Sequence, residues 1–251
     1  MRTNFGRLWL VICVILVGCV EGPHPRLSAL FGTQIYHHQQ PDPVWPQLQR
    51  IGLVVYSDTS GPDAAPAISP AFLETLSRRT EEFLTQQCRV SFVLPIAFPS
   101  STQHAQIQQE LLSSGQKHGL SHLLLVILSS QEYSGPVTLG EERMMTQMSG
   151  TTFENMALAE VVLLGLADYV VTFDLPGAAT ETLEVLDAPI GKGRLSRADS
   201  LDILRAQAGQ QALDRSLNIL GKQCHGGREK TAFMDVTDNF QTGDRVQSPV
   251  L

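Results

Sequence analysis

The chain has 251 residues, carries a formal net charge of −7, and is 43% hydrophobic with only 17% charged residues. This composition can bury one sizeable core, and the length fits one domain with less regular ends. The acidic balance argues against a nucleic-acid partner, because phosphate recognition needs clustered Lys and Arg side chains.

Residues 1–18 have the layout of a cleavable export signal. Arg2 and Arg7 precede a short apolar run that ends at Leu16-Val17-Gly18-Cys19. This run is much shorter than the roughly 20 residues that a helix needs to cross the ~30 Å hydrocarbon core of a membrane. The four-residue end resembles the bacterial lipobox, which implies cleavage before Cys19 and a lipid on its sulfur. The alternative is an ordinary secretory signal with an incidental cysteine.

A lipid on Cys19 predicts membrane attachment, since two or more acyl chains such as palmitate anchor a protein stably at ~0.8 kcal/mol per buried CH₂. Val20 follows the cysteine where Asp is the usual inner-membrane retention signal, so resemblance to enterobacterial sorting implies the periplasmic face of the outer membrane. Loss of residues 1–18 removes two arginines and no acid, which lowers the net charge from −7 to −9. An electrostatic attraction to anionic lipid is therefore not expected.

The segment after the lipid site is rich in proline and polar residues, so we expect residues 19–47 to be the lipid attachment site and a flexible tether. His37 and His38 have no acid or cysteine at ligand spacing, and no metal site is predicted there. A single domain then occupies residues 48–223. The polar residues 224–251 are expected to form a disordered tail.

The first half of the domain alternates strands and helices. Ser69 followed by Pro70 marks a helix start, and Gly119 marks a helix stop. Two strand-helix-strand units imply parallel pairing with right-handed crossovers. The expected elements are a strand at 51–56, a helix from 70 to about 87, a strand at 89–96, a helix at 101–118 and a strand at 120–128.

The stretch 134–152 interrupts this pattern, because it is rich in Gly, Met, Thr and Glu. We expect a long mobile loop or an inserted helical turn there. Met144, Met145 and Met148 have soft side chains that suit either a packed lid or an adaptable contact with a partner. We take these residues as the candidate partner contact.

The second half of the domain is predicted to be a hairpin followed by a helix. An apolar run at 157–175 precedes the turn signal Pro176-Gly177, and 180–186 alternates polar and apolar residues. Residues 200–223 then repeat apolar positions at helical spacing. The predicted fold class is α/β (α+β), a mixed sheet from strand-helix-strand-helix-strand followed by an antiparallel hairpin and a C-terminal helix.

Cys88 and Cys224 are the cysteines that remain after the signal and the lipid site. In an oxidising compartment such a pair can form a disulfide, and the alternative is two separate thiols. They lack the Cys-x-x-Cys spacing of a zinc or redox site, so neither is predicted.

No combination of residues for catalysis is found in the sequence, which lacks a Gly-x-Ser-x-Gly elbow, a phosphate-binding Gly-rich loop and a His-Glu-x-x-His helix. Asp168 and Asp174 are interpreted as a solvated strand face. His104, His118 and His122 are interpreted as loop or core histidines and not as a ligand set. We therefore expect no catalytic residue, no metal and no cofactor.

The order of elements after a lipobox resembles a group of periplasmic lipoproteins over about residues 48 to 223. The match is to the rhombotarget lipoprotein family, and more distantly to the curli-secretion lipoproteins and the activators of penicillin-binding proteins. His122 stands where those relatives have Asp. The matching segments are Arg50-Ile51-Gly52-Leu53-Val54-Val55, Gly119-Leu120-Ser121-His122-Leu123-Leu124-Leu125, Thr172-Phe173-Asp174-Leu175-Pro176 and Ala188-Pro189-Ile190-Gly191.

The lipobox and the lack of a catalytic motif favour a non-catalytic, lipid-anchored envelope protein, an accessory for assembly, secretion or regulation of another envelope component. Its implied partners are the membrane, through the lipid on Cys19, and an envelope protein. The alternative is a periplasmic hydrolase or small-ligand-binding lipoprotein whose site the sequence motifs do not reveal.

Overall fold

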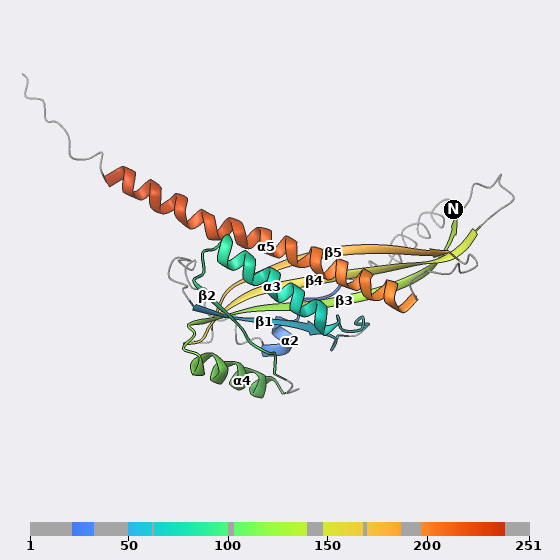
Figure 1. Ribbon diagram of the computed structural model, residues 1–251, viewed down its shortest axis with the longest axis horizontal. Coiled ribbons are helices and arrows are strands. Elements are labelled where there is room, and N and C mark those ends of the chain that lie inside the picture. The colour runs from blue at the N-terminus through green and yellow to red at the C-terminus, as the bar shows by residue number, and fades with distance from the viewer. Residues whose placement is uncertain are drawn as a thin grey trace, which may run out of the picture.

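The computed structural model describes residues 22–32, 50–61, 63–99, 103–139, 148–167, 170–186 and 197–238. Its elements are α2 (Leu27–Phe31), β1 (Arg50–Asp58), α3 (Pro70–Gln86), β2 (Phe92–Pro95), α4 (His104–Lys117), β3 (His122–Leu139), β4 (Met148–Gly165), β5 (Val171–Leu186) and α5 (Arg197–Asp238). They form one mixed sheet with helices on both faces, which confirms the predicted fold class (Figure 1).

The five-stranded sheet has the order β2-β1-β3-β4-β5. Strand β1 pairs in parallel with both β2 and β3, as the two strand-helix-strand units predict, and β3, β4 and β5 follow as an antiparallel meander. Helix α3 begins at Pro70 with Ser69 as its N-cap residue, and Gly119 after α4 has a φ of +61°. The two predicted helix boundary signals are confirmed.

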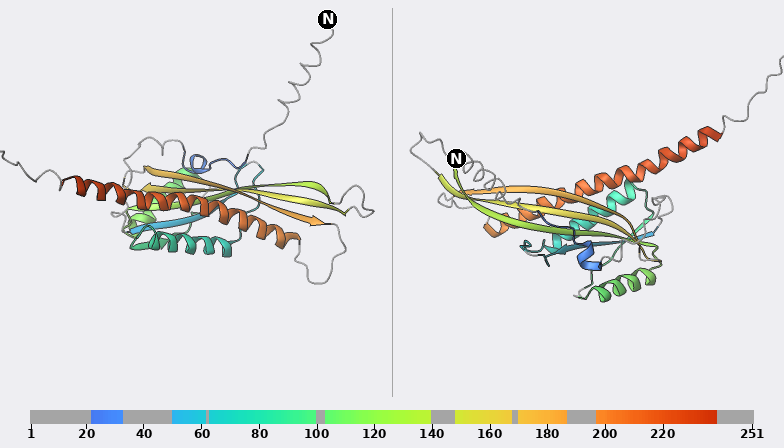
Figure 2. Two further views of the ribbon diagram at one scale, coloured as in Figure 1. Left: turned by 90° about the horizontal axis from the view of Figure 1, so that it is seen from above. Right: turned by 180° about the vertical axis from the view of Figure 1, so that it is seen from behind.

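The faces of the sheet carry separate hydrophobic clusters. The first, which we call the α5 face, contains Ile51, Leu124, Val161 and their neighbours, and is covered by α3 and α5. The second, the α4 face, contains Val54, Leu125, Val162 and their neighbours, and is covered by α2 and α4. Figure 2 shows α5 lying along one side of the long strands and α4 on the other side.

The α5 face is closed covalently. Cys88 and Cys224 form a disulfide with a Cα–Cα distance of 5.1 Å, which decides between the two alternatives that the sequence leaves open. Cys88 follows the end of α3 and Cys224 lies in α5, so the bond ties together the two helices that pack on the same face.

The prediction of a turn at Pro176-Gly177 is wrong. The chain instead turns between Gly165, where β4 ends, and Val171, where β5 begins. Pro176 and Gly177 lie inside β5, and Pro176 pairs with Glu160 of β4. Proline is tolerated there because β5 is an edge strand, whose outer N–H groups need no partner strand. Gly177 lies under α5, where an added Cβ would stand 2.7 Å from the backbone nitrogen of Ser216. Its small size serves helix packing and not a turn.

The prediction of a loop or helical turn at 134–152 is also wrong for most of that stretch. Strands β3 and β4 stay in register from His122 opposite Gly165 to Leu139 opposite Met148. The ladder continues because cross-strand hydrogen bonds, and not local propensity, hold these Gly- and Thr-rich residues extended. Beyond the end of β1, the strands β3, β4 and β5 form a long projection that we call the arm (Figure 1).

Parts of the predicted flexible tether and of the predicted disordered tail belong to described segments. Residues 22–32, inside the predicted tether 19–47, pack on the α4 face, with Leu27 fully buried. Helix α5 continues through Cys224 to Asp238, inside the predicted tail 224–251. In the first case, burial of apolar side chains outweighs the polar local composition. Within the described residues, no helix combines the length and the apolar character needed to cross a membrane.

Candidate functional site

The described part of the predicted tether docks as a short helix on the α4 face. We call residues 22–32 the strap. Its apolar side chains Leu27, Leu30 and Phe31 are 0%, 7% and 3% exposed. Burial of a Leu or Phe side chain contributes roughly 1.5–3 kcal/mol. The Gln108 side chain of α4 donates a hydrogen bond of 2.7 Å to the carbonyl of Phe31, which holds the end of the strap against α4.

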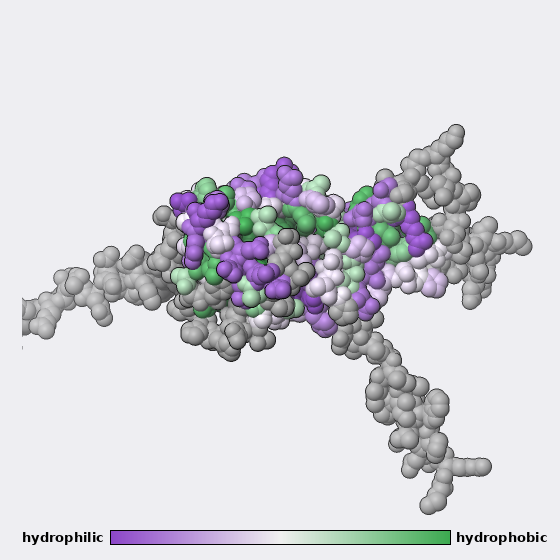
Figure 3. All heavy atoms as spheres, turned by 90° about the horizontal axis from the view of Figure 1, so that it is seen from below, coloured by the Kyte–Doolittle hydropathy of each residue, from purple (hydrophilic) through white to green (hydrophobic). Residues whose placement is uncertain are grey.

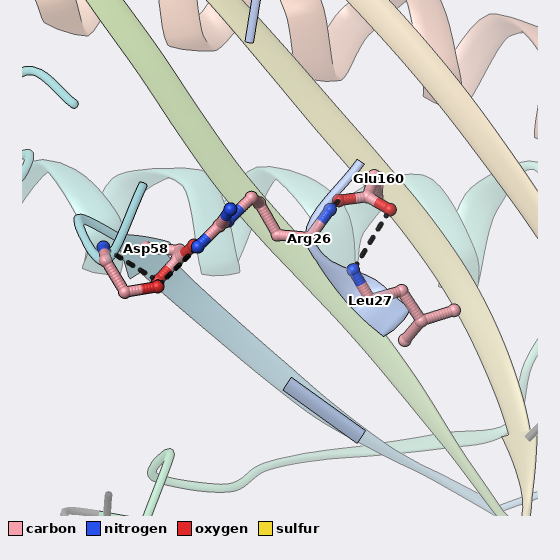
Figure 4. Close-up of polar contacts among 5 residues, drawn as sticks. Arg26, Leu27, Asp58 and Glu160 are labelled. Carbon is pink, nitrogen blue, oxygen red and sulfur yellow. Dashed lines mark hydrogen bonds and ion pairs between the residues drawn. The ribbon is translucent and has the colours of Figure 1, made fainter. Parts of the chain in front are cut away.

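Glu160 on β4 holds the beginning of the strap. Its carboxylate accepts a hydrogen bond from the backbone N–H of Arg26, and one of 3.3 Å from the N–H of Leu27 (Figure 4). Glu160 is 0% exposed and lies in an inner strand, between Ile127 of β3 and Pro176 of β5. A buried carboxylate without hydrogen-bond partners would be very unfavourable, so Glu160 and the strap stabilise each other.

Asp58 at the end of β1 binds the side chain of Arg26. The guanidinium Nε lies 2.5 Å from Oδ2 of Asp58, and the other carboxylate oxygen accepts hydrogen bonds from the N–H and hydroxyl of Ser60. Arg26 also donates a 2.6 Å hydrogen bond to the Ser60 hydroxyl. One strap residue therefore joins β4 through its backbone and β1 through its side chain, across the intervening strand β3 (Figure 4).

Burial gives these carboxyl groups unusual protonation behaviour. Burial raises the pKa of Glu160 to about 7, although the N–H groups of Arg26 and Leu27 oppose the shift. Burial acts on Asp58 in the same sense, but its hydrogen bonds with Arg26 and Ser60 together hold its pKa below the ordinary value. The two carboxyl groups that bind the strap therefore have pKa values displaced in opposite directions.

Asp174 on β5 is the third acid of this group. It lies opposite Val162, on the same face as Glu160, and burial raises its pKa. Among the described residues, no donor reaches its Oδ1 atom. Asp174 is half-buried and its Oδ1 atom is buried, so it is less exposed than the solvated strand face that the sequence suggested. Asp168 lies outside the described residues.

A small hollow lies beside the strap and the Arg26–Asp58 ion pair. Figure 3, which views the molecule from the α4 side, shows hydrophilic and hydrophobic side chains intermixed on this face. The hollow is lined by Pro23, His24, Arg26, Asp58, Gly61, Ala64, Ser129, Ser130 and Gln131.

The histidines singled out in the sequence do not converge. His104 begins α4 and His118 follows its end, and the 14 residues of that helix separate them by about 21 Å. His122 begins β3, with its Nδ1 atom 2.9 Å from the hydroxyl of Ser121. Within the described ranges, no group of three or more His, Cys, Asp or Glu side chains is arranged to hold a metal ion.

The predicted sites Cys19, Met144 and Met145 lie outside the described residues, as do His37 and His38, where no metal site was predicted. Met148 begins β4, opposite Leu139 at the end of the arm. The sequence interpretation missed Arg26, Asp58 and Glu160 altogether. One signal was present, because Glu160 is the single acid within the otherwise apolar run 156–166.

Neither a family model nor a curated protein matches the chain. Among solved structures, it is similar to a neuraminyllactose-binding hemagglutinin homologue of Helicobacter pylori, at 11% identity and a TM-score of 0.43, over 81% of this chain and 97% of that one. It is also similar to rare lipoprotein B of Shewanella oneidensis, at 14% identity and a TM-score of 0.26, over 75% and 98% of the two chains.

A lipoprotein of Neisseria meningitidis is a further structural neighbour, at 12% identity and a TM-score of 0.26, over 61% of this chain and 94% of that one. Two of these three neighbours are lipoproteins by name. Identities of 11 to 14% with TM-scores of 0.26 to 0.43 assign this chain to none of their families.

Proposed function

We propose that this chain is a non-catalytic, lipid-anchored protein of the bacterial cell envelope, attached through Cys19 at the periplasmic face of the outer membrane. In this proposal it serves as an accessory for the assembly, secretion or regulation of another envelope component. The observation that carries the proposal is that the strap is docked on the domain a few residues after the lipobox-like sequence. The lipobox-like residues Leu16-Val17-Gly18-Cys19 stand directly before a segment that is built into the domain through Arg26 and Leu27.

The use of the buried acids supports a binding role over a catalytic one. Both oxygens of Glu160 accept hydrogen bonds from the strap, and both oxygens of Asp58 accept hydrogen bonds from Arg26 or Ser60. A general acid or base must instead reach a proton of the substrate directly or through one water molecule. These carboxyl groups act in holding the chain together.

Lipidation is tested by Cys19→Ala. The wild type is expected to incorporate an alkyne fatty acid and to sediment with membranes, and the variant is expected to do neither. Cys13→Ala is the matched control, because it alters a cysteine within the predicted signal and leaves the lipobox residues intact. Continued labelling of Cys19→Ala would contradict the proposed anchor.

We further propose that the envelope partner is contacted at the end of the arm where Met148 begins β4, together with Met144 and Met145, which lie between β3 and β4 in the sequence. A photo-crosslinking residue at position 144 in native membranes is expected to capture a defined partner. The same residue at Glu74, an exposed position on α3, is the control. Equal capture from both positions would contradict the arm as the contact.

A further inference from the structure

The strap joins the proposed anchor to the domain, and its docked position limits the distance between them. From Cys19 to Gly22 the chain makes three residue steps, which span at most about 11 Å. If the strap left the α4 face, the chain from Cys19 to Arg50 would make 31 steps, with a maximum span of about 110 Å. Docking therefore decides whether the domain is confined to the membrane surface or can extend far from it.

The contacts of the strap are few and separable from the rest of the fold. No strand pairing involves the described strap residues, which contribute one five-residue helix. Its polar attachments are the backbone bonds to Glu160, the Arg26–Asp58 ion pair and the Gln108 bond. The sheet itself is held from its other face by α5 and the disulfide, so the strap can detach without loss of the main core.

We propose that the strap is a releasable spacer, and that the buried acids Glu160 and Asp58 set its docking so that the domain is held more tightly near its anchor under mildly acidic conditions than in alkaline conditions. This inference rests on the proposed lipid anchor for its effect on reach. The docking equilibrium itself does not depend on the anchor.

The direction of the pH dependence follows from the groups around Glu160. Arg26 of the strap and Asp174 of β5 act on Glu160 itself. Asp58 and Tyr56 of β1 interact with Arg26, and His24 of the strap lines the same hollow as Arg26 and Asp58. When the strap leaves, Glu160 becomes accessible to water, and its pKa returns from about 7 toward the ordinary 4.5. The docked state therefore binds the proton more tightly, so docking is strongest below the ordinary value and weakens as the pH rises through about 7.

The neighbouring acids define the rest of the pH window. The raised pKa of Asp174 acts in the same sense as that of Glu160. The lowered pKa of Asp58 acts in the opposite sense, because its ion pair with Arg26 is lost when the carboxylate is protonated in acid. Docking is thus strongest between the ordinary Asp value of 3.8 and the ordinary Glu value of 4.5, and it weakens as the pH rises from there through about 7.

The test is amide hydrogen exchange of the full lipidated chain in vesicles at pH 6 and pH 8, corrected for the intrinsic exchange rate. The amides of Leu27, Leu30 and Gly32 report docking, since their N–H groups bond to Glu160, Arg26 and Ser28. With a Glu160 pKa of about 7, the docking constant is expected to fall about tenfold between these pH values. Core amides of β3, such as Leu125, should keep their protection and show that the fold is intact.

Glu160→Gln removes the titrating group with little change in shape, and is expected to abolish this tenfold change. Glu154→Gln is the matched control, because Glu154 lies on the same strand, six positions away on the same face, and is exposed. Equal strap protection at the two pH values in the wild type would overturn the proposal. If Glu160→Gln lost strap protection between pH 6 and pH 8 as the wild type is expected to do, the role of Glu160 would be overturned.

Energy transfer from a bilayer dye to a dye on Glu74→Cys measures the reach in the same vesicles. Transfer is expected to fall from pH 6 to pH 8 together with strap protection, and constant transfer despite strap release would overturn the spacer role. A chain that shows the exchange effect but does not bind the vesicles would instead disprove the lipid anchor. The two proposals therefore fail in distinguishable ways.

Discussion

The two faces of the sheet are closed by different kinds of interaction. The α5 face is covered by two long helices over a continuous apolar cluster, and the Cys88–Cys224 disulfide links those helices. The α4 face is covered by the shorter helix α4 and the strap, and buried carboxyl groups hold the strap in place. The first arrangement rests on apolar packing and a covalent bond, whereas the second includes carboxyl groups whose pKa values are displaced from their ordinary values. The two faces of one sheet can therefore differ in the kind of interaction that holds their covering segments.

The largest expected effect comes from the disulfide. The double variant Cys88→Ala and Cys224→Ala should lose about 4–5 kcal/mol of unfolding free energy, because the bond closes a loop with a sequence separation of 136 residues. Urea unfolding of the oxidised wild type and the variant measures this. Reduced wild type is the control and should unfold like the variant. An unchanged midpoint would contradict the covalent closure of the α5 face.

Gly177→Ala tests the packing of α5 on β5. The new Cβ would stand 2.7 Å from the Ser216 nitrogen and also meet the carbonyl of Ala212, so the helix must shift. Overpacking of this kind costs about 1–3 kcal/mol. Gly135→Ala in β3 is the control, since nothing lies within 4 Å of its added Cβ. If both variants unfold at the same urea concentration, the close approach of α5 at Gly177 is refuted.

Leu27→Ala should have the smallest effect on global unfolding. Loss of a fully buried Leu weakens docking of the strap by about 2–3 kcal/mol, but the main cores remain. Hydrogen exchange should show lost protection at Leu30 and Gly32 with little change in the unfolding midpoint. Leu111→Ala, on α4 in the same cluster, should instead lower the midpoint. A large midpoint shift from Leu27→Ala would show that the strap is part of the main cooperative unit.

Local signals in the sequence determined much of this fold. The Ser69–Pro70 start of α3 and the Gly119 stop after α4 depend on backbone preferences of one or two residues, and each is found as predicted. The order of strands and helices likewise follows from short apolar periodicities. Such features are set within a few residues of chain, so no knowledge of distant contacts is needed.

Tertiary structure decided the features that depend on distant partners. Pro176-Gly177 has the local composition of a turn, yet it lies in β5 because the strand ladder extends past it and α5 needs a glycine there. Glu160 binds the strap across 134 positions of sequence, and Arg26 reaches Asp58 across 32. A buried charge is stable only where the fold supplies its partner, and the pairing of Glu160 with the Arg26 and Leu27 amides exists only once sheet and strap meet.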